Sequence, residues 1–72
     1  MRSFTDDAGV RWEVFLGKAS WGTLVLLFSP LAGGDTRASI LHAETMFAAT
    51  GELDALSDDD LRVRLRDSQP WP

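Results

Sequence analysis

The sequence predicts an α+β fold, a small antiparallel β-meander of three to four strands followed by one broken or two short C-terminal helices. Three patterns support this prediction. Apolar and polar residues alternate across residues 10–17, residues 23–29 form a continuous apolar run, and apolar residues recur at helical spacing from residue 44 onward. With 72 residues in all, we expect one domain over 1–72, with the meander at 1–42 and a helical acidic tail at 43–69.

The first two predicted strands, residues 2–5 and 10–17, flank the segment Asp6-Asp7-Ala8-Gly9. An Asp side chain can accept hydrogen bonds from the backbone that follows it, and a glycine can adopt positive φ, so this segment is typical of a hairpin turn. On the second strand, alternation predicts one buried face, made by Val10, Trp12, Val14 and Leu16. Phe15 falls on the opposite, otherwise polar face.

The third predicted strand, residues 23–29, is apolar on both faces. Leu24, Leu26 and Phe28 share one phase, whereas Val25 and Leu27 share the other. Such a strand is typical of the middle of a sheet that is covered on both sides.

The segment 36–42 is compatible with a fourth strand, because Ala38, Ile40 and His42 alternate with other residues. A helix capped by Asp35 or Thr36 is the alternative. We favour the strand.

Two helical segments are expected in the tail. Met46, Ala49, Leu53 and Leu56 form one helical stripe, and Gly51 is expected to break it as a C-terminal cap. In the second segment, Ser57 is a good N-cap, and residues 58–60 place three aspartates at the positive end of the helix dipole. Alternation across 61–66 leaves a strand open there, but the cap and the charge order favour a helix that ends by Pro70.

Composition excludes several kinds of chemistry. The chain has no cysteine and one histidine, His42, which excludes disulfides, cysteine-ligated zinc or iron–sulfur sites, and zinc sites with several histidines. No local arrangement offers His42 catalytic partners, and Gly33-Gly34 lacks the spacing of a phosphate loop. The consecutive aspartates 58–60 fit a helix cap better than a cation site. We therefore expect no enzyme activity, no cofactor and no metal.

Charge and hydropathy narrow the partners further. The longest apolar run, Leu24–Phe28, is far shorter than the about 20 residues of a membrane span, and no secretory signal is visible, so we expect a cytoplasmic protein without membrane contact. The whole net charge of −4 falls in residues 44–72, which makes nucleic acid an improbable partner. One functional hypothesis is accordingly a small acidic regulator that occupies a basic, even nucleic-acid-binding, surface of a partner.

The leading hypothesis rests on the third strand. A single helical layer covers one face of a sheet, yet this strand is apolar on both. Either the tail wraps back over the second face with Trp71 as its anchor, or another chain covers it. We expect a non-enzymatic protein-interaction or assembly module, which self-associates as a homo-oligomer or docks on a larger protein partner. The candidate partner-binding residues are Phe15, Trp21, Val25, Leu27 and Trp71.

The opening Phe4-Thr5-Asp6-x-x-Gly9-x-x-Trp12-x-Val14 resembles the start of short bacterial proteins of uncharacterised function, which share an F-x-D-x-x-G-x-x-W-x-V hairpin. Two further segments are similar to theirs, Leu27-Phe28-Ser29 at a strand end and the acidic stretch 56–61. The resemblance covers about half the chain and carries only motifs that make the fold. It implies no activity, cofactor or site.

Overall fold

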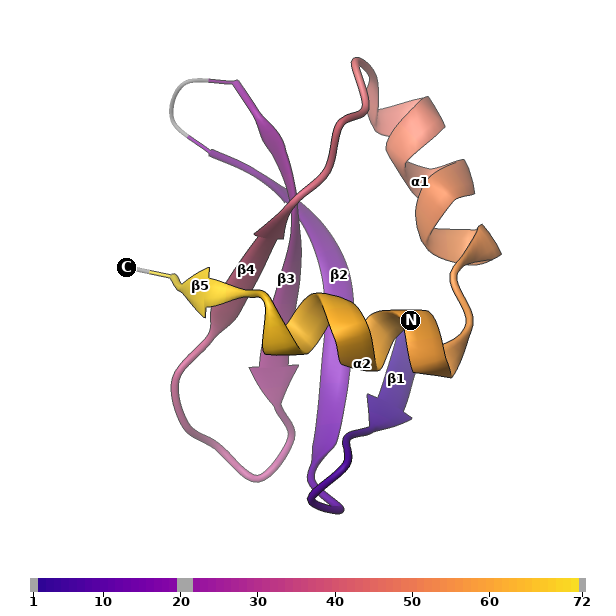
Figure 1. Cartoon of the computed structure of the whole chain (residues 1–72). Helices are drawn as coiled ribbons and strands as arrows, with labels where there is room; N and C mark the ends of the chain where they lie inside the picture. Colours follow the sequence, from indigo (N-terminus) through magenta and orange to yellow (C-terminus); the bar gives the residue numbers. More distant parts are fainter. Residues whose placement is uncertain (1, 20–21, 72) are drawn as a thin grey trace.

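The computed structural model describes residues 2–19 and 22–71. Within them the chain forms a five-stranded antiparallel sheet and two helices, which confirms the α+β class (Figure 1). In chain order the elements are β1 Arg2–Thr5, β2 Arg11–Lys18, β3 Leu24–Pro30, β4 Arg37–Ile40, α1 Met46–Ala55, α2 Asp58–Arg66 and β5 Gln69–Pro70. The strands lie in the sheet in the same order as in the sequence, so every neighbouring pair is antiparallel and no connection crosses the sheet.

The β1–β2 hairpin forms as its local chemistry predicts. Oδ1 of Asp6 accepts hydrogen bonds from the backbone N–H of Ala8 and of Val10, both at 2.9 Å, and Gly9 has a φ of 83°. Oδ2 of Asp6 accepts from the indole N–H of Trp12 at 2.8 Å. This indole bond, followed by the backbone bonds, holds the pKa of Asp6 below its ordinary value. The predicted burial of Val10 is wrong, because β2 starts one residue later and Val10 is exposed at the turn.

The ambiguous segment 36–42 contains a strand, β4, at residues 37–40. A fifth strand, which the sequence did not predict, follows α2. Its residues Gln69 and Pro70 pair with Ala38 and Arg37, and the N–H of Trp71 donates to the carbonyl of Thr36 at 2.9 Å. The guanidinium of Arg37 secures this return by donating to the hydroxyl and the carbonyl oxygen of the buried Ser68.

The expected break at Gly51 is wrong, because α1 runs through Gly51 to Ala55. Thr45 caps its start by accepting from the N–H of Ala48, and Ala49 and Leu53 hold it on the sheet. The tail breaks at residues 56–57 instead. There Ser57 and Asp60 form a capping box, in which each side chain accepts a hydrogen bond from the other's backbone N–H.

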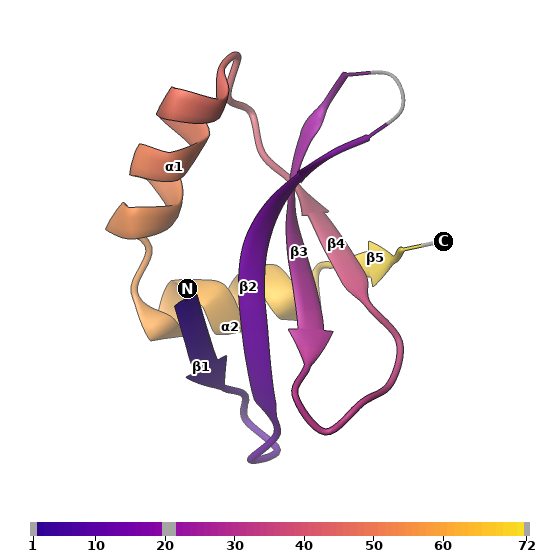
Figure 2. The ribbon, with the colours of Figure 1, turned by 180° about the vertical axis from the view of Figure 1, so that it is seen from behind.

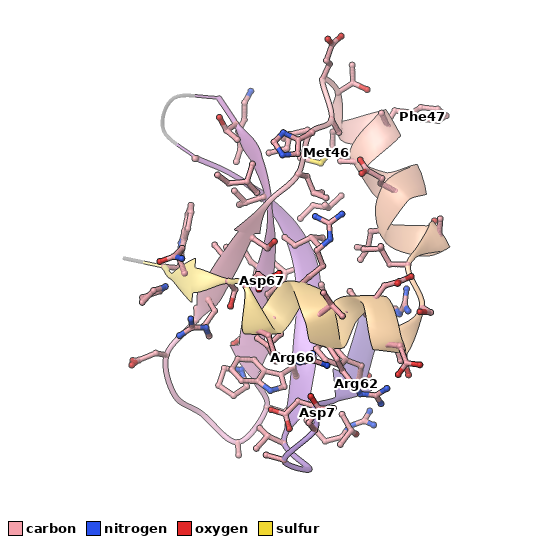
Figure 3. The ribbon with its side chains drawn as sticks, viewed as in Figure 1. Asp7, Met46, Phe47, Arg62, Arg66 and Asp67 are labelled. Atoms are coloured by element: carbon pink, nitrogen blue, oxygen red, sulfur yellow. The ribbon has the colours of Figure 1, made fainter. Side chains whose placement is uncertain are left out.

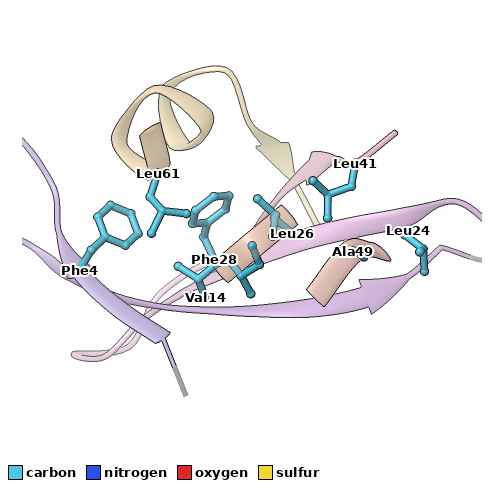
Figure 4. Packing of buried hydrophobic residues seen from close by; sticks show 9 residues of the cluster. Phe4, Val14, Leu24, Leu26, Phe28, Leu41, Ala49 and Leu61 are labelled. Carbon is cyan, nitrogen blue, oxygen red and sulfur yellow. The ribbon is translucent and has the colours of Figure 1, made fainter. Parts of the chain in front are cut away.

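The hydrophobic core lies between one face of the sheet and both helices (Figure 4). Phe4 and Phe28 meet edge to face there, with ring centroids 6.0 Å apart, and Leu61 of α2 packs with them in the same cluster. The other members of the buried cluster are Val14, Leu24, Leu26, Leu41, Ala49 and Leu53. Both helices therefore pack on this one face of the sheet.

Candidate protein-interaction face

We call the side of the sheet opposite the helices the outer face. Strand pairing fixes its layout, because side chains alternate between the two sides of a strand. One row across the sheet consists of Phe15, Leu27 and Ala38, and the next consists of Gly17, Val25 and Ile40. Within β2, β3 and β4 these two rows are entirely apolar, and we call their six residues the apolar rows. They run across β2, β3 and β4 at the upper half of the sheet in Figure 2. On β5 the first row continues to the exposed Gln69, which pairs with Ala38.

The outer face becomes polar toward the β1–β2 turn. The next row carries Ser3, Glu13 and Ser29. Beyond it, the guanidinium of Arg11 donates to the hydroxyl of Thr5 at 3.2 Å and to the hydroxyl of Ser3 at 3.0 Å. An apolar centre with a hydrogen-bonded polar rim on one side is the usual composition of a protein-binding surface.

The residues of the apolar rows differ in exposure, since two of them protrude and two are buried. Phe15 is 40% exposed and Ile40 is 53% exposed, whereas Val25 is 2% and Leu27 9% exposed. Leu27 leans toward Gly17, since a Cβ atom built on Gly17 would come within 2.5 Å of its Cδ1 atom. Val25 and Leu27 of the central strand are therefore buried, whereas Phe15 and Ile40 protrude on either side of it.

The structure places four of the five predicted partner-binding residues. Phe15, Val25 and Leu27 lie together in the apolar rows. Trp71 is half-buried at the end of β5, and it shares their side of the sheet because it stands two residues beyond Gln69, which pairs with Ala38. Trp21 lies outside the described residues. Ala38 and Ile40 complete the site, and their alternation on the predicted fourth strand is the signal that could have identified them.

The helical tail covers the core side of the sheet. Ala49 and Leu53 of α1 and Leu61 of α2 all belong to the buried cluster with Phe4 and Phe28. From the opposite side of the molecule, the sheet stands in front of α2 (Figure 2). Trp71 extends the sheet at its edge beside Thr36 and does not fold across β3. In residues 2–19 and 22–71, neither helix supplies a cover for the apolar rows.

Both edges of the sheet are blunted. At the β1 edge, the carbonyl of Thr5 accepts a hydrogen bond from the guanidinium Nε of Arg62 at 2.8 Å. At the β5 edge, the N–H of Trp71 donates inward to the carbonyl of Thr36. Because N–H groups alternate in direction along a strand, the outward position belongs to the preceding residue, Pro70, and a proline has no N–H to offer. These groups oppose the addition of a further strand at β1 and along β5.

A second exposed apolar feature lies on α1, and the sequence did not predict it. Phe47 is 89% exposed and points away from the sheet from the first turn of the helix (Figure 3). Met46, expected in the buried stripe, is also exposed. Phe47 directly follows Met46, which puts it outside the stripe formed with Ala49 and Leu53, so a helical projection of the sequence could have found it.

The aspartates that begin α2 have partners within the chain. Asp58 accepts from Arg2 at 3.2 Å, Asp59 accepts from Arg62 at 2.6 Å, and Asp60 belongs to the capping box. Hydrogen bonds from the backbone and hydroxyl of Ser57 hold the pKa of Asp60 below its ordinary value. These contacts reduce the charge that the acidic turn can offer to a basic surface.

The remaining polar groups are dispersed. His42 is exposed in the segment between β4 and α1. Across the described ranges, no three histidine, aspartate or glutamate side chains gather as the ligands of a metal ion would. Neither of the two helices traced there approaches the length and apolarity that a bilayer crossing requires.

Comparisons with known proteins add no relative. No protein-family model matches the chain, and neither a curated protein nor a solved structure matches it.

Proposed function

We propose that this chain is a non-enzymatic protein-interaction or assembly module that binds its partner through the outer face. The observation that carries the proposal is the pair Phe15 and Ile40, 40% and 53% exposed, on a side of the sheet that no described helix covers. They protrude on either side of β3, whose outer-face residues Val25 and Leu27 are 2% and 9% exposed, and Ala38 lies in the same rows. Contiguous apolar patches bordered by polar residues are typical of partner sites.

The blunted sheet edges support the same surface. A partner that added a strand to β1 would meet Arg62 on the carbonyl of Thr5, and a partner at β5 would meet a proline. Aromatic and branched apolar side chains are the groups that contribute most when a contact excludes water. The outer face offers both kinds, whereas the edges offer few free backbone groups.

The alternative proposal is a small acidic regulator that occupies a basic surface of its partner. It receives less support, because the aspartates at the start of α2 are engaged by Arg2, Arg62 and the capping box. Replacing Asp59 by Asn separates the two proposals. The acidic mechanism predicts weaker, less salt-dependent binding, whereas the outer-face mechanism predicts no change.

The test of the leading proposal compares three forms of the chain as bait and in solution. They are the unchanged chain, Phe15→Glu, and the control Phe47→Glu, which adds the same charge to an exposed apolar residue of α1. We expect the unchanged chain and the control to bind a common protein, either a second copy or another partner, and Phe15→Glu to lose it. A chain that stays monomeric at every concentration and binds nothing that depends on Phe15 would overturn the proposal.

A further inference from the structure

The apolar rows have a layout that suits a second copy of the same surface. Phe15 protrudes on one side of β3, in the row that continues through Ala38 to Gln69. Ile40 protrudes on the other side, in the row that begins at Gly17. Each row therefore combines one large residue with one small residue on opposite sides of β3. A two-fold axis parallel to β3, placed between two copies of the sheet, lays β2 of one copy over β4 of the other. Large residues of one copy then meet small residues of the other.

We propose that the partner on the outer face is a second copy of this chain, packed sheet against sheet around a two-fold axis along β3. This inference rests on the proposed function. In this arrangement Phe15 of each copy lies over Ala38 of the other. Leu27 leans away from Ala38 toward Gly17, which leaves Ala38 as the low point of its row. Ile40 of each copy lies over Gly17 of the other copy and over the Leu27 side chain that occupies the space beside that glycine. The contact is therefore apolar there as well.

Charge placement favours this side of the molecule over the helical side. The outer face carries Arg11 and Glu13, whose charges cancel, so two copies can approach without net repulsion. The charged residues of α1 and the segment before it are acidic, namely Glu44, Glu52 and Asp54, and Asp54 falls on the same helical face as Phe47. Two copies meeting through α1 would bring like charges together, which disfavours that contact.

The size of the surface indicates a weak dimer. The apolar rows span three strands about 4.8 Å apart, and about five residues of strand at about 3.4 Å each give a projected area of roughly 250 Å² per chain. Two such faces stay below the about 1,200 Å² of a standard specific interface, in the range of weak contacts. We expect a dimer that dissociates on dilution.

The first experiment measures molar mass by light scattering and sedimentation over a wide concentration range. We expect the unchanged chain and Phe47→Glu to shift from one to two chain masses as concentration rises, and Phe15→Glu and Ile40→Glu to remain at one. Circular dichroism verifies that each variant is folded, as expected for exposed positions. If Phe47→Glu removes the shift and Phe15→Glu does not, the contact lies on α1 and the inference is wrong.

The second experiment tests the axis and uses the absence of cysteine from the chain. Under the proposed symmetry, Ser29 on β3 faces Ser29 of the second copy across a sheet spacing of about 10 Å. Ser3 lies in the same row, two strands away from the axis. A thiol-reactive crosslinker that spans this spacing should therefore join copies of Ser29→Cys and spare copies of Ser3→Cys. Equal crosslinking of both variants would refute the axis.

The outcomes also separate this inference from the proposed function. If the unchanged chain stays monomeric at all concentrations but binds another protein that Phe15→Glu loses and Phe47→Glu keeps, the second copy is refuted and the interaction module stands. If neither self-association nor any binding depends on Phe15 or Ile40, both are refuted.

Discussion

Replacing Arg2 by Met should loosen α1 far more than its place at the start of β1 suggests. The guanidinium of Arg2 donates to the carbonyls of Leu53 and Leu56 at 3.1 and 2.6 Å, and to Asp58 at 3.2 Å. The two carbonyls belong to the end of α1. That of Leu53 also accepts from the N–H of Leu56 at 3.2 Å, whereas that of Leu56 is among the carbonyls that a helix end leaves without an intrahelical partner. Methionine keeps much of the apolar stem but removes all three hydrogen bonds.

The magnitude follows from the surroundings of this guanidinium. Hydrogen bonds from charged groups contribute about 1.5–3 kcal/mol each when they are shielded from water. The Arg2 side chain is 28% exposed, so solvent replaces part of this interaction. We expect the free energy of unfolding to fall by about 1–3 kcal/mol, against a total of roughly 4–11 kcal/mol for a domain of this length. The Asp58 contact contributes the smaller part, because that carboxylate is solvated.

Urea denaturation and amide hydrogen exchange together measure this effect. The matched control is Arg66→Met, which removes an ion pair with Asp7 in which both side chains are more than half exposed. We expect it to lower the free energy of unfolding by less than about 1 kcal/mol. In Arg2→Met, exchange should accelerate in the last turn of α1 before it does so in β3. If the two variants lose equal stability, or if α1 keeps its protection, the capping role of Arg2 is refuted.

Four further predictions concern the core, two glycines and the response to acid. Leu61→Ala should lower the free energy of unfolding by about 2–5 kcal/mol in urea denaturation, because Leu61 is fully buried in the core. Gly51→Ala should raise the thermal midpoint, with a gain of about 0.5–1 kcal/mol, since Gly51 is helical and a Cβ there meets nothing within 4 Å. Gly9→Ala should lower it, because a φ of 83° strains any residue with a Cβ. The free energy of unfolding should fall as pH drops below about 4, and it should fall less steeply in Asp6→Asn. The pKa of Asp6 is lower in the folded chain than in the unfolded chain, so its carboxylate stabilises the fold above the unfolded pKa. This contribution disappears as pH falls through the folded pKa.

The sequence was informative where a few neighbouring residues determine the structure. Asp6 and Gly9 make the first turn through contacts within five residues, and Ser57 and Asp60 start α2 in the same local way. The two-sided apolar pattern of β3 likewise placed it in the sheet interior between β2 and β4. In each of these cases the physical cause lies inside the segment that was read.

The features that the sequence did not predict depend mainly on interactions between residues distant in the sequence. β5 has two residues and no periodicity, and it forms because Arg37 holds Ser68 across an interval of 31 residues. Gly51 does not end α1, because the anchors Ala49 and Leu53 compensate for its cost of about 1 kcal/mol. Phe47 is an exception of another kind, because its position outside the stripe of Ala49 and Leu53 is a local signal of exposure that the general burial of large apolar residues outweighed.

The candidate site was predicted in part for the same reason. Phe15, Val25 and Leu27 share a side because of strand alternation alone, which a sequence displays directly. Ala38 and Ile40 join them only through the register of β3 with β4, which no short segment encodes. Which side the helices would cover was also open, since both faces of β3 are apolar.

The consecutive strand order has a consequence for synthesis on the ribosome. Residues 2–40 can pair hairpin by hairpin as they emerge, because each strand needs only the one before it. The helices that cover Phe4 and Phe28 are translated afterwards, from residue 46 to residue 66. At about 5–20 residues per second, the sheet would precede the helices that complete the core by roughly 1–5 s. During that interval Phe4 and Phe28 would lie on an uncovered face of the sheet, and their exposure would end when α2 docks.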